Sequence, residues 1–563
     1  MLPDQLLAFI QSILQSLSKD ENNQIQDFSK LTVEKPKSLS YGDYSTNAAL
    51  VFAKNFKKKP YELAKLITEK LDLEPNIAKT EIAGPGFINI TLEKQALGCI
   101  VNTIIDKKSD FGKGDFEKDK NINLEFVSAN PTGPIHIGGA RWAAVGDALA
   151  NLLLFAGEKV EREYYFNDHG NQIDNFVNSI IAKYYKNDIP KDGYDGEYIY
   201  EIAEKIMPLA EKKFDKLESL NDLELATAKE FIREKSVNIM FGEIKDSLNN
   251  FGTHFDIFFH EDDLYKTDEV DQAIEQLREK GYVYEKDGAL WLATSKEGDD
   301  KDRVLKKSTG EYSYFAADVA YYKNKRDRGF GTCVYMLGVD HHGYIGRMEA
   351  VCKAFGDKPG ENMIFLIGQF VNIVKNGKVV KLSKRAGNII TLDDLVDAVG
   401  VDAARFSLIR SAVSTAIDLD LDLLVSHTNE NPVYYVQYAY ARCSNVIKNA
   451  LQFGVDIGKI KSGKGFDSSL LTQTSENDLL TTLASFPDII KMSAKSFEVH
   501  RIARFLETLA SKYHTWYSHC RVLPNTPDEI GDLHFARLAL NCATAQVLEN
   551  GLNLLGVSAP KRM

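Results

Sequence analysis

The segment from Asn121 to Ala150 constrains the fold more than any other part of the chain, because a strand, a tight turn and a helix follow one another there. Its apolar run is typical of a buried parallel strand, and the sequence Asn-Pro-Thr-Gly-Pro at residues 130–134 ends that strand. The apolar residues of the run are Ile122, Leu124, Phe126 and Val127. After His136 the apolar residues recur at steps of three and four, which predicts a helix. This order predicts an α/β fold with a nucleotide site at the turn.

The start of that helix suits a phosphate group. The N–H groups of a first helical turn lack partners within the helix, and the helix end is positive. Gly138 and Gly139 have no Cβ atoms, so a phosphate and a flat base can approach the backbone closely. His136 can add a hydrogen-bond donor to the same phosphates. We therefore expect free backbone N–H groups at this position.

The composition narrows the class of protein. The chain has 563 residues and a formal net charge of -12, which argues against a protein that coats nucleic acid through a broad basic surface. Its six cysteines form no Cys-x-x-Cys pair, so neither a zinc knuckle nor a disulfide framework is expected, and reduced thiols fit the cytoplasm. The chain begins with an amphipathic pattern rather than a signal peptide, and no apolar run is long enough for a membrane span.

The patterns along the chain predict three parts. Residues 1–115 mix helical and alternating patterns, which predicts a separate α+β module that ends in a polar linker. Strand and helix patterns alternate over residues 116–400, which predicts a Rossmann-type doubly wound parallel sheet with a polar helical insertion at about 190–250. Residues 401–563 show helical periodicity alone, which predicts an all-α bundle.

A second basic motif follows a predicted hairpin around Asn376 and Gly377. The residues are VVKLSKRAGN at 379–388, with Lys381, Ser383 and Lys384 in the centre. The two ammonium groups can neutralise a leaving pyrophosphate, and the hydroxyl can donate a hydrogen bond to a phosphate oxygen. A similar run, KMSAKS at 491–496, has an inserted alanine and lies in the helical region, so it is interpreted as a solvated helix segment.

Several blocks of the chain together resemble the arginyl-tRNA synthetases, which are class I aminoacyl-tRNA synthetases. The first is EFVSANPTGPIHIGG at 125–139, and the run at 379–388 resembles the K-M-S-K-S loop in a K-L-S-K variant. Other blocks are SYGDYSTNAAL at 40–50, REYYFNDHGNQID at 162–174, GYDGEYI at 193–199, GVDHHGYIGRMEAV at 338–351, and the ending GLNLLGVSAPKRM at 551–563. The resemblance implies a catalytic Rossmann domain, an N-terminal module that touches the tRNA elbow, and an anticodon-binding bundle.

The resemblance also implies roles for individual residues. Catalytic roles fall to His136, Lys381, Ser383 and Lys384. The expected ATP contacts are Pro131, Thr132, Gly133, His136, Gly138, Gly139, Lys381 and Lys384. The expected arginine contacts are Glu125, Ser128, Asn130, Tyr314, Asp318 and His341. Tyr314 and Asp318 are four residues apart, on one face if helical, and a carboxylate matches the planar charge of a guanidinium group.

The implied activity is the ATP-dependent ligation of L-arginine to tRNA. Mg²⁺ would accompany ATP as a substrate complex, with no tightly bound cofactor and no protein metal site. The expected partners are L-arginine, ATP and the arginine tRNA, with no membrane, and the protein is expected to be a monomer in the cytoplasm. In the bundle, Tyr434, Tyr435, Tyr438 and Tyr440 could stack on bases, although core packing is the commoner role at that spacing.

Two alternatives remain open on the sequence alone. Another class I synthetase, such as the cysteinyl type, should bring zinc ligands, and no suitable cluster of cysteine and histidine is present in the sequence. An inactive relative could serve as a tRNA-binding scaffold. Gly139 supports this second alternative, because the family usually has a second histidine at that position.

Overall fold

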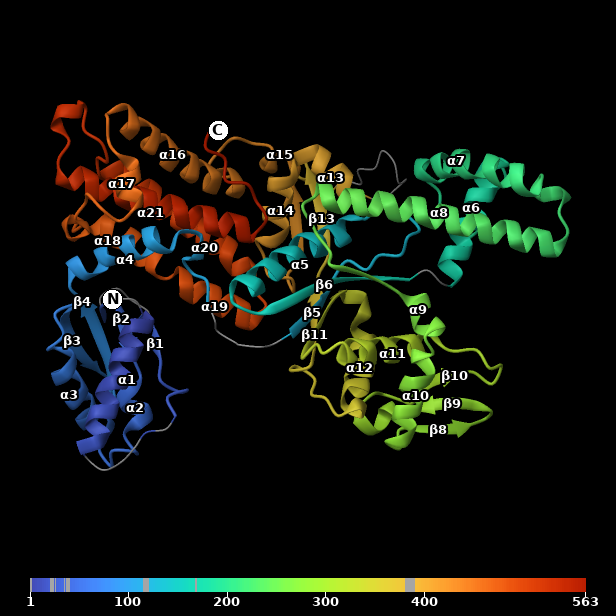
Figure 1. The fold of residues 1–563 in the computed structure, drawn as a ribbon, viewed down its shortest axis with the longest axis horizontal. Coiled ribbons are helices and arrows are strands. Elements are labelled where there is room, and N and C mark those ends of the chain that lie inside the picture. The colour runs from blue at the N-terminus through green and yellow to red at the C-terminus, as the bar shows by residue number, and fades with distance from the viewer. Residues whose placement is uncertain are drawn as a thin grey trace.

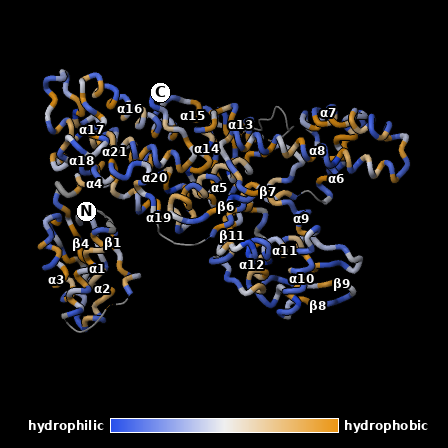
Figure 2. Tube along the Cα trace, viewed as in Figure 1, coloured by the Kyte–Doolittle hydropathy of each residue, from blue (hydrophilic) through white to orange (hydrophobic). Residues whose placement is uncertain are grey.

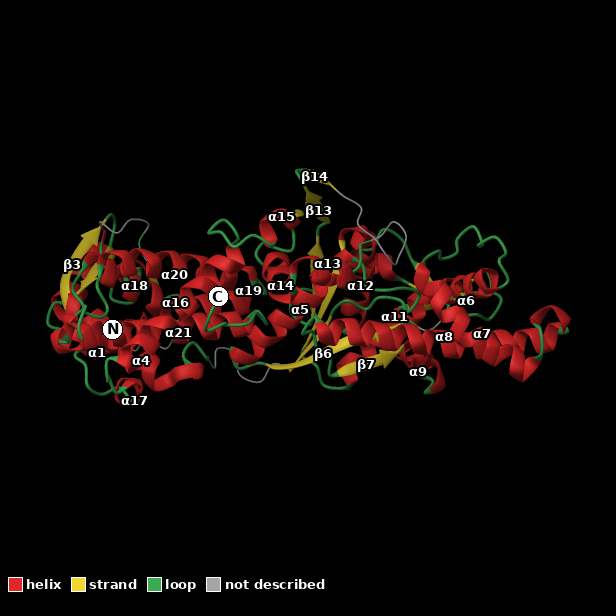
Figure 3. Ribbon diagram, turned by 90° about the horizontal axis from the view of Figure 1, so that it is seen from above, coloured by secondary structure: helices red, strands yellow, loops and turns green. Residues whose placement is uncertain are grey.

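The computed structural model describes residues 3–20, 25, 27–34, 36, 41–114, 121–167, 170–379 and 390–563. The molecule is elongated, with a central parallel sheet, helical layers on either side, and smaller units at both ends (Figures 1 and 3). None of the helices in this described part combines the length and the apolar composition that a membrane crossing requires.

The N-terminal module is an antiparallel sheet covered by helices. Its elements are α1 (Pro3–Asp20), β1 (Val33–Glu34), β2 (Tyr44–Thr46), α2 (Ala48–Phe52), α3 (Pro60–Leu71), β3 (Ile77–Ala83) and β4 (Phe87–Leu92), with the strand order β1-β2-β4-β3. This confirms the predicted α+β character. The next helix, α4 (Lys94–Lys107), packs against helices of the C-terminal bundle, so the predicted boundary near residue 115 stays a prediction.

The central sheet has five strands, all parallel to their neighbours. These are β5 (Asn121–Glu125), β6 (Lys159–Phe166), β7 (Ile257–His260), β11 (Thr332–Gly338) and β12 (Met363–Gly368), in the order β12-β11-β5-β6-β7. The chain therefore winds outward from β5 in one direction and then from β11 in the other. This confirms the doubly wound sheet and places the change of direction between β5 and β11, where such sheets bind ligands.

Helices cover the sheet and carry the signature residues. They are α5 (Ile137–Phe155), which follows β5, α11 (Tyr314–Asp327), which precedes β11, and α12 (His342–Phe355), which follows it. Two insertions interrupt the winding. Between β6 and β7, α6 (Asn171–Tyr184), α7 (Glu197–Phe214) and α8 (Asp222–Asn250) form a helical arm, which lies at the far right of Figure 1.

The second insertion is a small unit between β7 and α11 that the sequence patterns did not predict. It consists of α9 (Glu261–Lys266), α10 (Glu269–Glu279) and an antiparallel sheet of β8 (Val283–Lys286), β9 (Ala289–Leu292) and β10 (Arg303–Lys306). Its apolar side chains pack with those of α11 and α12 in a core separate from the main one. The strands are too short and too polar on one side to stand out from a loop in the sequence.

The second motif follows a hairpin, as predicted. Strands β13 (Val371–Lys375) and β14 (Lys378–Val379) pair across Asn376 and Gly377, which have φ angles of 51° and 69°. Positive φ at both central residues is the geometry of a tight hairpin turn. The parallel partner of β13 is β15 (Ile417–Asp420). Lys381, Ser383 and Lys384 lie outside the described residues.

The rest of the chain is helical. After α13 (Leu392–Val399), α14 (Val401–Ile409) and α15 (Leu421–Leu424), the bundle consists of α16 (Pro432–Gln452), α17 (Ile457–Lys461), α18 (Thr474–Ala484), α19 (Phe486–Ser496), α20 (His500–His519) and α21 (Asp532–Leu554). This confirms the all-α prediction for the bundle, whereas β15 is a strand that lies beyond residue 401, where the sequence predicted helices alone. The KMSAKS run forms the end of α19, which confirms the predicted helix. The prediction that this helix is solvated was only partly right, because Ser493 and Ala494 are buried.

Helix α5 lies at the centre of the molecule and is buried on almost every side. In Figure 2 it forms one of the hydrophobic stretches at the middle of the trace. Two buried arginines fix it. Arg141 donates to the carbonyl oxygens of Gln369, Ala412 and Thr415 at 2.9–3.0 Å. On the other side, Asp147 of α5 pairs with Arg405 of α14 at 2.7 Å.

Replacing Arg405 by leucine should destabilise the protein by about 3 kcal/mol, because Asp147 would lose its close partner while still buried. Arg405 also donates to the backbone of residues 251, 252 and 555, and these carbonyls would lose a donor. Urea unfolding followed by circular dichroism would measure the loss. The control is Arg278→Leu, which removes an exposed pair with Glu275 and should cost less than about 1 kcal/mol. Equal effects of the two changes would contradict the importance of the buried pair.

Candidate active site

Strand β5 ends in a strained turn. Val127 and Ser128 have φ angles of 67° and 41°, and the N–H of Ser128 donates to the carbonyl of Phe126 at 2.9 Å. A positive φ is costly for a β-branched residue. The Ser128 hydroxyl accepts from the Tyr165 N–H at 3.1 Å and donates to Glu125 at 3.3 Å. The turn therefore fixes Ser128, a predicted arginine contact, between two strand ends.

The loop after this turn contains three of the predicted ATP contacts. Pro131 and Thr132 are buried, whereas Gly133 is half-buried. The Thr132 N–H donates to the carbonyl of Asn130 at 2.8 Å, and its own carbonyl accepts from the Tyr198 hydroxyl at 3.0 Å. A Cβ atom at Gly133 would lie 3.1 Å from the same hydroxyl. The loop is thus held closely against the helical arm.

His136 caps helix α5. Its Nδ1 accepts from the N–H groups of Gly138 and Gly139 at 3.0 and 3.3 Å. The N–H groups of Ile137 and Ala140 donate to backbone carbonyls at 3.0 Å. The expectation of free N–H groups at this helix start was therefore wrong. The sequence shows that a histidine precedes the helix, but not that its ring folds back over the first turn.

The cap determines which ring nitrogen of His136 can donate. Because Nδ1 accepts two N–H groups, the ring proton is on Nε2 in the neutral form. The His136 side chain is exposed to solvent. Nε2 is therefore the atom of this segment that can donate a hydrogen bond to a phosphate oxygen.

The structure offers a reason for the glycine at position 139. A Cβ atom there would lie 2.9 Å from Cγ2 of Ile135, which is buried. Isoleucine branches at Cβ, so its methyl group cannot easily rotate away. Gly139 thus allows Ile135 to pack against the start of the helix, and a histidine at this position would require Ile135 to move.

The two signature regions meet at the first turn of α5. The N–H of Ile137 donates to the carbonyl of Ile390 at 3.0 Å, and the N–H of Leu392 donates to the carbonyl of Ile135 at 2.7 Å. His136 and Thr391 form an isolated antiparallel bridge. Residues 390–392 follow the motif at 379–388 after one intervening residue. The chain leaving the second motif is therefore hydrogen-bonded to the first one, although the two are far apart in sequence.

Three acids, Asp318, Glu261 and Glu125, form an acid cluster at α11 and at the carboxyl ends of β7 and β5. Asp318, in the second turn of α11, is half-buried and accepts a hydrogen bond from Tyr344. Burial, together with the negative charges of Glu261 and Glu125, raises the pKa of Asp318 to about 7. The positive charge of Arg347 offsets part of this effect. Glu261 is 4% exposed and accepts from the Tyr165 hydroxyl at 2.8 Å. A cluster of acids of this kind is suited to a cation.

The other predicted arginine contacts come from several different elements. Tyr314 is the first residue of α11 and is exposed, with its hydroxyl directed toward Gly170. His341 is exposed, and its ring meets that of Tyr344 edge to face at 6.4 Å. Asn130 donates to the side chain of Gln172, at the start of α6.

Glu261 and Tyr344 were not among the predicted site residues. Glu261 follows β7 directly, so it lies at the carboxyl end of a parallel strand, like the residues after β5. An acid directly after a parallel strand is a sequence signal for a ligand site. The signal was missed because β7 is too short to be recognised as a strand of the sheet. Tyr344 lies in the block at 338–351, which was recognised without a role for the tyrosine.

Within the part of the chain that the structure describes, no three histidine, cysteine, aspartate or glutamate side chains gather as a metal site requires. All six cysteines have free thiols.

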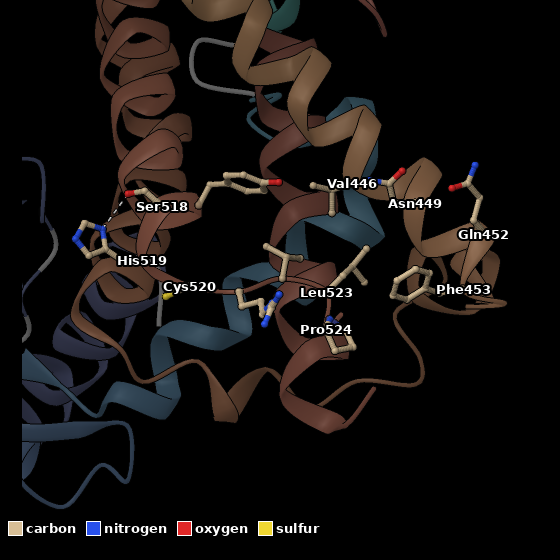
Figure 4. A pocket seen from close by; sticks show the side chains of 12 residues that line it. Val446, Asn449, Gln452, Phe453, Ser518, His519, Cys520, Leu523 and Pro524 are labelled. Atoms are coloured by element: carbon tan, nitrogen blue, oxygen red, sulfur yellow. Dashed lines mark hydrogen bonds between the residues drawn. The ribbon is translucent and has the colours of Figure 1, made fainter. Parts of the chain in front are cut away.

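The C-terminal bundle has a separate pocket of about 530 Å³ between α16 and the chain that follows α20 (Figure 4). Its lining combines aromatic rings, amides and a guanidinium group, namely Phe453, Tyr517, Asn449, Gln452 and Arg521, together with apolar residues. Such a lining can stack on a flat base and hydrogen-bond to its edge.

Near this pocket, α16 carries a row of stacked rings. Tyr434 stacks on His427 and on Tyr438, at centroid distances of 5.5 and 5.8 Å. Arg442 lies over the ring of Tyr438 at 4.6 Å and over the ring of Tyr517, which lines the pocket, at 5.1 Å. The fourth predicted tyrosine, Tyr440, is buried and belongs to the core.

Comparison with known families covers most of the chain. Residues 4–92 match the arginyl tRNA synthetase N terminal domain, and residues 100–412 match the catalytic domain of class I (R) tRNA synthetases. Residues 436–563 match the DALR anticodon binding domain.

Individual relatives agree with these matches. The chain is 50% identical to an arginine–tRNA ligase of Kineococcus radiotolerans, over 95% of this chain and 94% of the relative. It is 48% identical to an arginine–tRNA ligase of Bifidobacterium adolescentis, with the same coverage of 95% and 94%. A solved structure of a putative arginyl tRNA synthetase from Campylobacter jejuni has a TM-score of 0.73 at 32% identity, and it covers 84% of this chain and 100% of its own. The arginyl-tRNA synthetase of Thermus thermophilus shares the fold, with a TM-score of 0.75 at 20% identity over 100% of both chains.

Replacing Gly139 by alanine should destabilise the protein by about 1–3 kcal/mol, because the new methyl group would press on Ile135 inside the packed start of α5. Gly242 of α8 provides the control, since a Cβ atom there meets nothing within 4 Å. Gly242→Ala should stabilise by up to about 1 kcal/mol through helix propensity. Urea unfolding of the two variants would show opposite signs, and a stabilising Gly139→Ala would contradict the packing explanation.

Proposed function

Because the chain belongs to the arginyl-tRNA synthetase family, we propose that its acid cluster binds the guanidinium group of arginine. The enzyme uses ATP to ligate L-arginine to tRNA. The observation that supports this proposal is the pair of acids, Asp318 on α11 and Glu261 at the end of β7, which are electrostatic neighbours of each other and of Tyr165. A guanidinium group can bind two carboxylates through its planar array of N–H donors, whereas an ammonium group is a point charge.

The remaining arginine contacts surround these acids. Tyr314 and His341 lie at the exposed rim, and we assign them to the side chain and to the backbone of the substrate, respectively. Ser128 and Asn130 follow the strained end of β5, where the carboxylate and amino group of arginine would meet ATP. Glu125 completes the set from the last position of β5.

The chemistry requires positioning and charge stabilisation rather than a protein nucleophile. The carboxylate of arginine attacks the α-phosphorus of ATP, pyrophosphate leaves, and the arginyl group then passes to the terminal adenosine of tRNA. We assign the Nε2–H of His136 to the phosphates, with Lys381, Ser383 and Lys384 acting on the leaving pyrophosphate. Mg²⁺ would accompany ATP and share in neutralising its charge.

Glycines and buried residues would shape the adenosine side of the site. Gly133 and Gly138 lack side chains where a base and ribose would approach the backbone. Pro131 and Thr132 hold the loop from within, and Gly139 keeps the helix start closely packed. The N–H groups of α5 support the imidazole of His136 in this arrangement, and the imidazole contacts the phosphate.

We assign the three predicted parts to tRNA binding and catalysis. Residues 1–115 would contact the elbow of the tRNA, residues 116–400 would perform catalysis, and residues 401–563 would bind the anticodon loop. The pocket between α16 and α20 and the adjoining Tyr434–Tyr438 stack support this last role, because both can hold unstacked bases. The free thiols support a cytoplasmic location, and we propose that the enzyme acts as a monomer.

Arginine binding should weaken as the pH falls below about 7. In the free enzyme the pKa of Asp318 is raised to about 7, so at lower pH its carboxyl group carries a proton that a guanidinium ligand must displace. The dissociation constant for L-arginine should rise up to about tenfold per pH unit below 7 and level off above it. Titration calorimetry from pH 5.5 to 8.5 would measure it.

Asp318→Asn is the matched test of this pH dependence. The amide cannot titrate, so arginine should bind more weakly at pH 8 and with a flatter pH profile. The control is Asp327→Asn, at the exposed end of the same helix, which should leave both affinity and profile unchanged. A wild-type profile in Asp318→Asn would remove Asp318 from the proposed arginine site.

Lys384→Ala should lower the rate of arginine-dependent exchange between pyrophosphate and ATP by about a hundredfold or more, while arginine affinity changes little. The reason is that its ammonium would act on charge that develops as pyrophosphate leaves. The assay is run with and without tRNA, because the family resemblance implies that activation waits for bound tRNA. An equal loss in rate and in arginine affinity would contradict this role.

A further inference from the structure

A buried lysine contacts Glu125, one member of the acid cluster. Lys325 is in the last turn of α11, and its side chain is 0% exposed. Its Nζ donates to Oε2 of Glu125 at 2.6 Å and lies 3.8 Å from Oε1 of Glu163. The ammonium group also lies over the rings of Tyr321 and Tyr335, at 4.3 and 4.0 Å from their centroids. The closest partner of Lys325 is thus Glu125, which is one of the predicted arginine contacts.

The surrounding charges form a small network. Glu163, which is opposite Glu125 on the neighbouring strand, takes Arg328 at 2.6 Å and a hydrogen bond from Asn123 at 3.0 Å. Arg328 also pairs with Glu161 at 3.1 Å, so Glu163 is stabilised by both Arg328 and Lys325, whereas Lys325 is the cation that pairs with Glu125. Buried ion pairs of this kind often add little to stability compared with apolar residues of the same size. Stability alone therefore does not explain why Lys325 and Glu125 are buried as an ion pair.

Glu125 connects the lysine to the proposed arginine site. One of its oxygens accepts from Lys325, and the other accepts from the Ser128 hydroxyl at 3.3 Å. Lys325 follows Asp318 by seven residues, so the two lie on similar faces of α11 about 10 Å apart along its axis. The charge of Glu125 also raises the pKa of Asp318, which shows that the two carboxylates are electrostatic neighbours.

We propose that Lys325 is a positioning residue for arginine binding, which holds the Glu125 carboxylate beside Ser128 without itself contacting the substrate. The proposal rests on the proposed arginine site. Without Lys325, Glu125 would lose the cation that holds one of its oxygens, and its carboxylate would no longer be fixed beside Ser128. A contact that must first be ordered when the ligand binds contributes less to affinity, so a guanidinium ligand would bind more weakly.

A double-mutant cycle of Lys325→Met, Glu125→Gln and the two changes combined tests the proposal. L-arginine binding is measured by titration calorimetry, and the KM for ATP is measured by pyrophosphate exchange. Lys325→Met should weaken arginine binding about tenfold, with the KM for ATP within about twofold of wild type. Adding Lys325→Met to Glu125→Gln should change arginine affinity by less than about twofold, because no carboxylate remains to be positioned.

Two outcomes would overturn the proposal. One is a folded Lys325→Met variant that binds arginine as wild type does, and the other is a double variant whose loss equals the product of the single losses. If Lys325→Met fails to fold, the comparison of Glu125→Gln with the double variant still decides, because the double change removes both charges of the pair and Glu163 keeps Arg328.

The matched control is Lys323→Met on the same helix. Lys323 pairs with Asp327 at the helix surface and should leave arginine binding unchanged. Loss of arginine affinity in this variant would indicate a general disturbance of α11 and would count against a specific role for Lys325. The titration of the wild-type protein tests the proposed arginine site separately from the role of Lys325. If the wild-type protein does not bind arginine, the proposed site itself is refuted, whatever the variants do.

Discussion

The arrangement of the active site depends on how helix α5 is held in the centre of the molecule. The helix is apolar on nearly all sides, so burial alone would allow it to rotate or slide. Its two buried polar anchors prevent this. Arg141 binds three carbonyl oxygens at the connections that lead into β13 and β15, and Asp147 binds Arg405 of α14. Hydrogen bonds are directional, so these contacts fix both the rotation and the depth of the helix.

This anchoring connects the first signature motif to the chain on both sides of the second. Arg141 binds the carbonyl of Gln369 just before β13, which leads into the second motif, and Ile137 binds the carbonyl of Ile390 just after it. Residues on both sides of the second motif are therefore hydrogen-bonded to the first two turns of the helix that His136 caps. The strand order changes direction between β5 and β11, which is the kind of point where such sheets bind ligands.

Local patterns in the sequence predict the elements but not the partners of buried polar groups. The strand before residue 130, the helix after His136 and the hairpin at Asn376 follow from apolar spacing and turn residues, which act over short distances. Lys325 and Glu125 are 200 positions apart, and nothing in either segment indicates that they pair. The same limit applies to the ring of His136, whose contact with its own helix depends on rotamer and packing. Glu261 was missed because β7 is only four residues long.

The strained end of β5 shows why such contacts matter more than propensity at this site. A β-branched residue such as Val127 disfavours positive φ by about 1–3 kcal/mol, so the turn exists only because other contacts determine it. The Ser128 hydroxyl binds β6 and Glu125, and the carbonyl of Ala129 accepts from Tyr164 at 2.6 Å. Had the strand continued in regular geometry, its side chains would have alternated across the two faces of the sheet. The turn instead brings Ser128 back beside Glu125, whose other oxygen is held by Lys325, so backbone strain and a buried ion pair act on the same carboxylate.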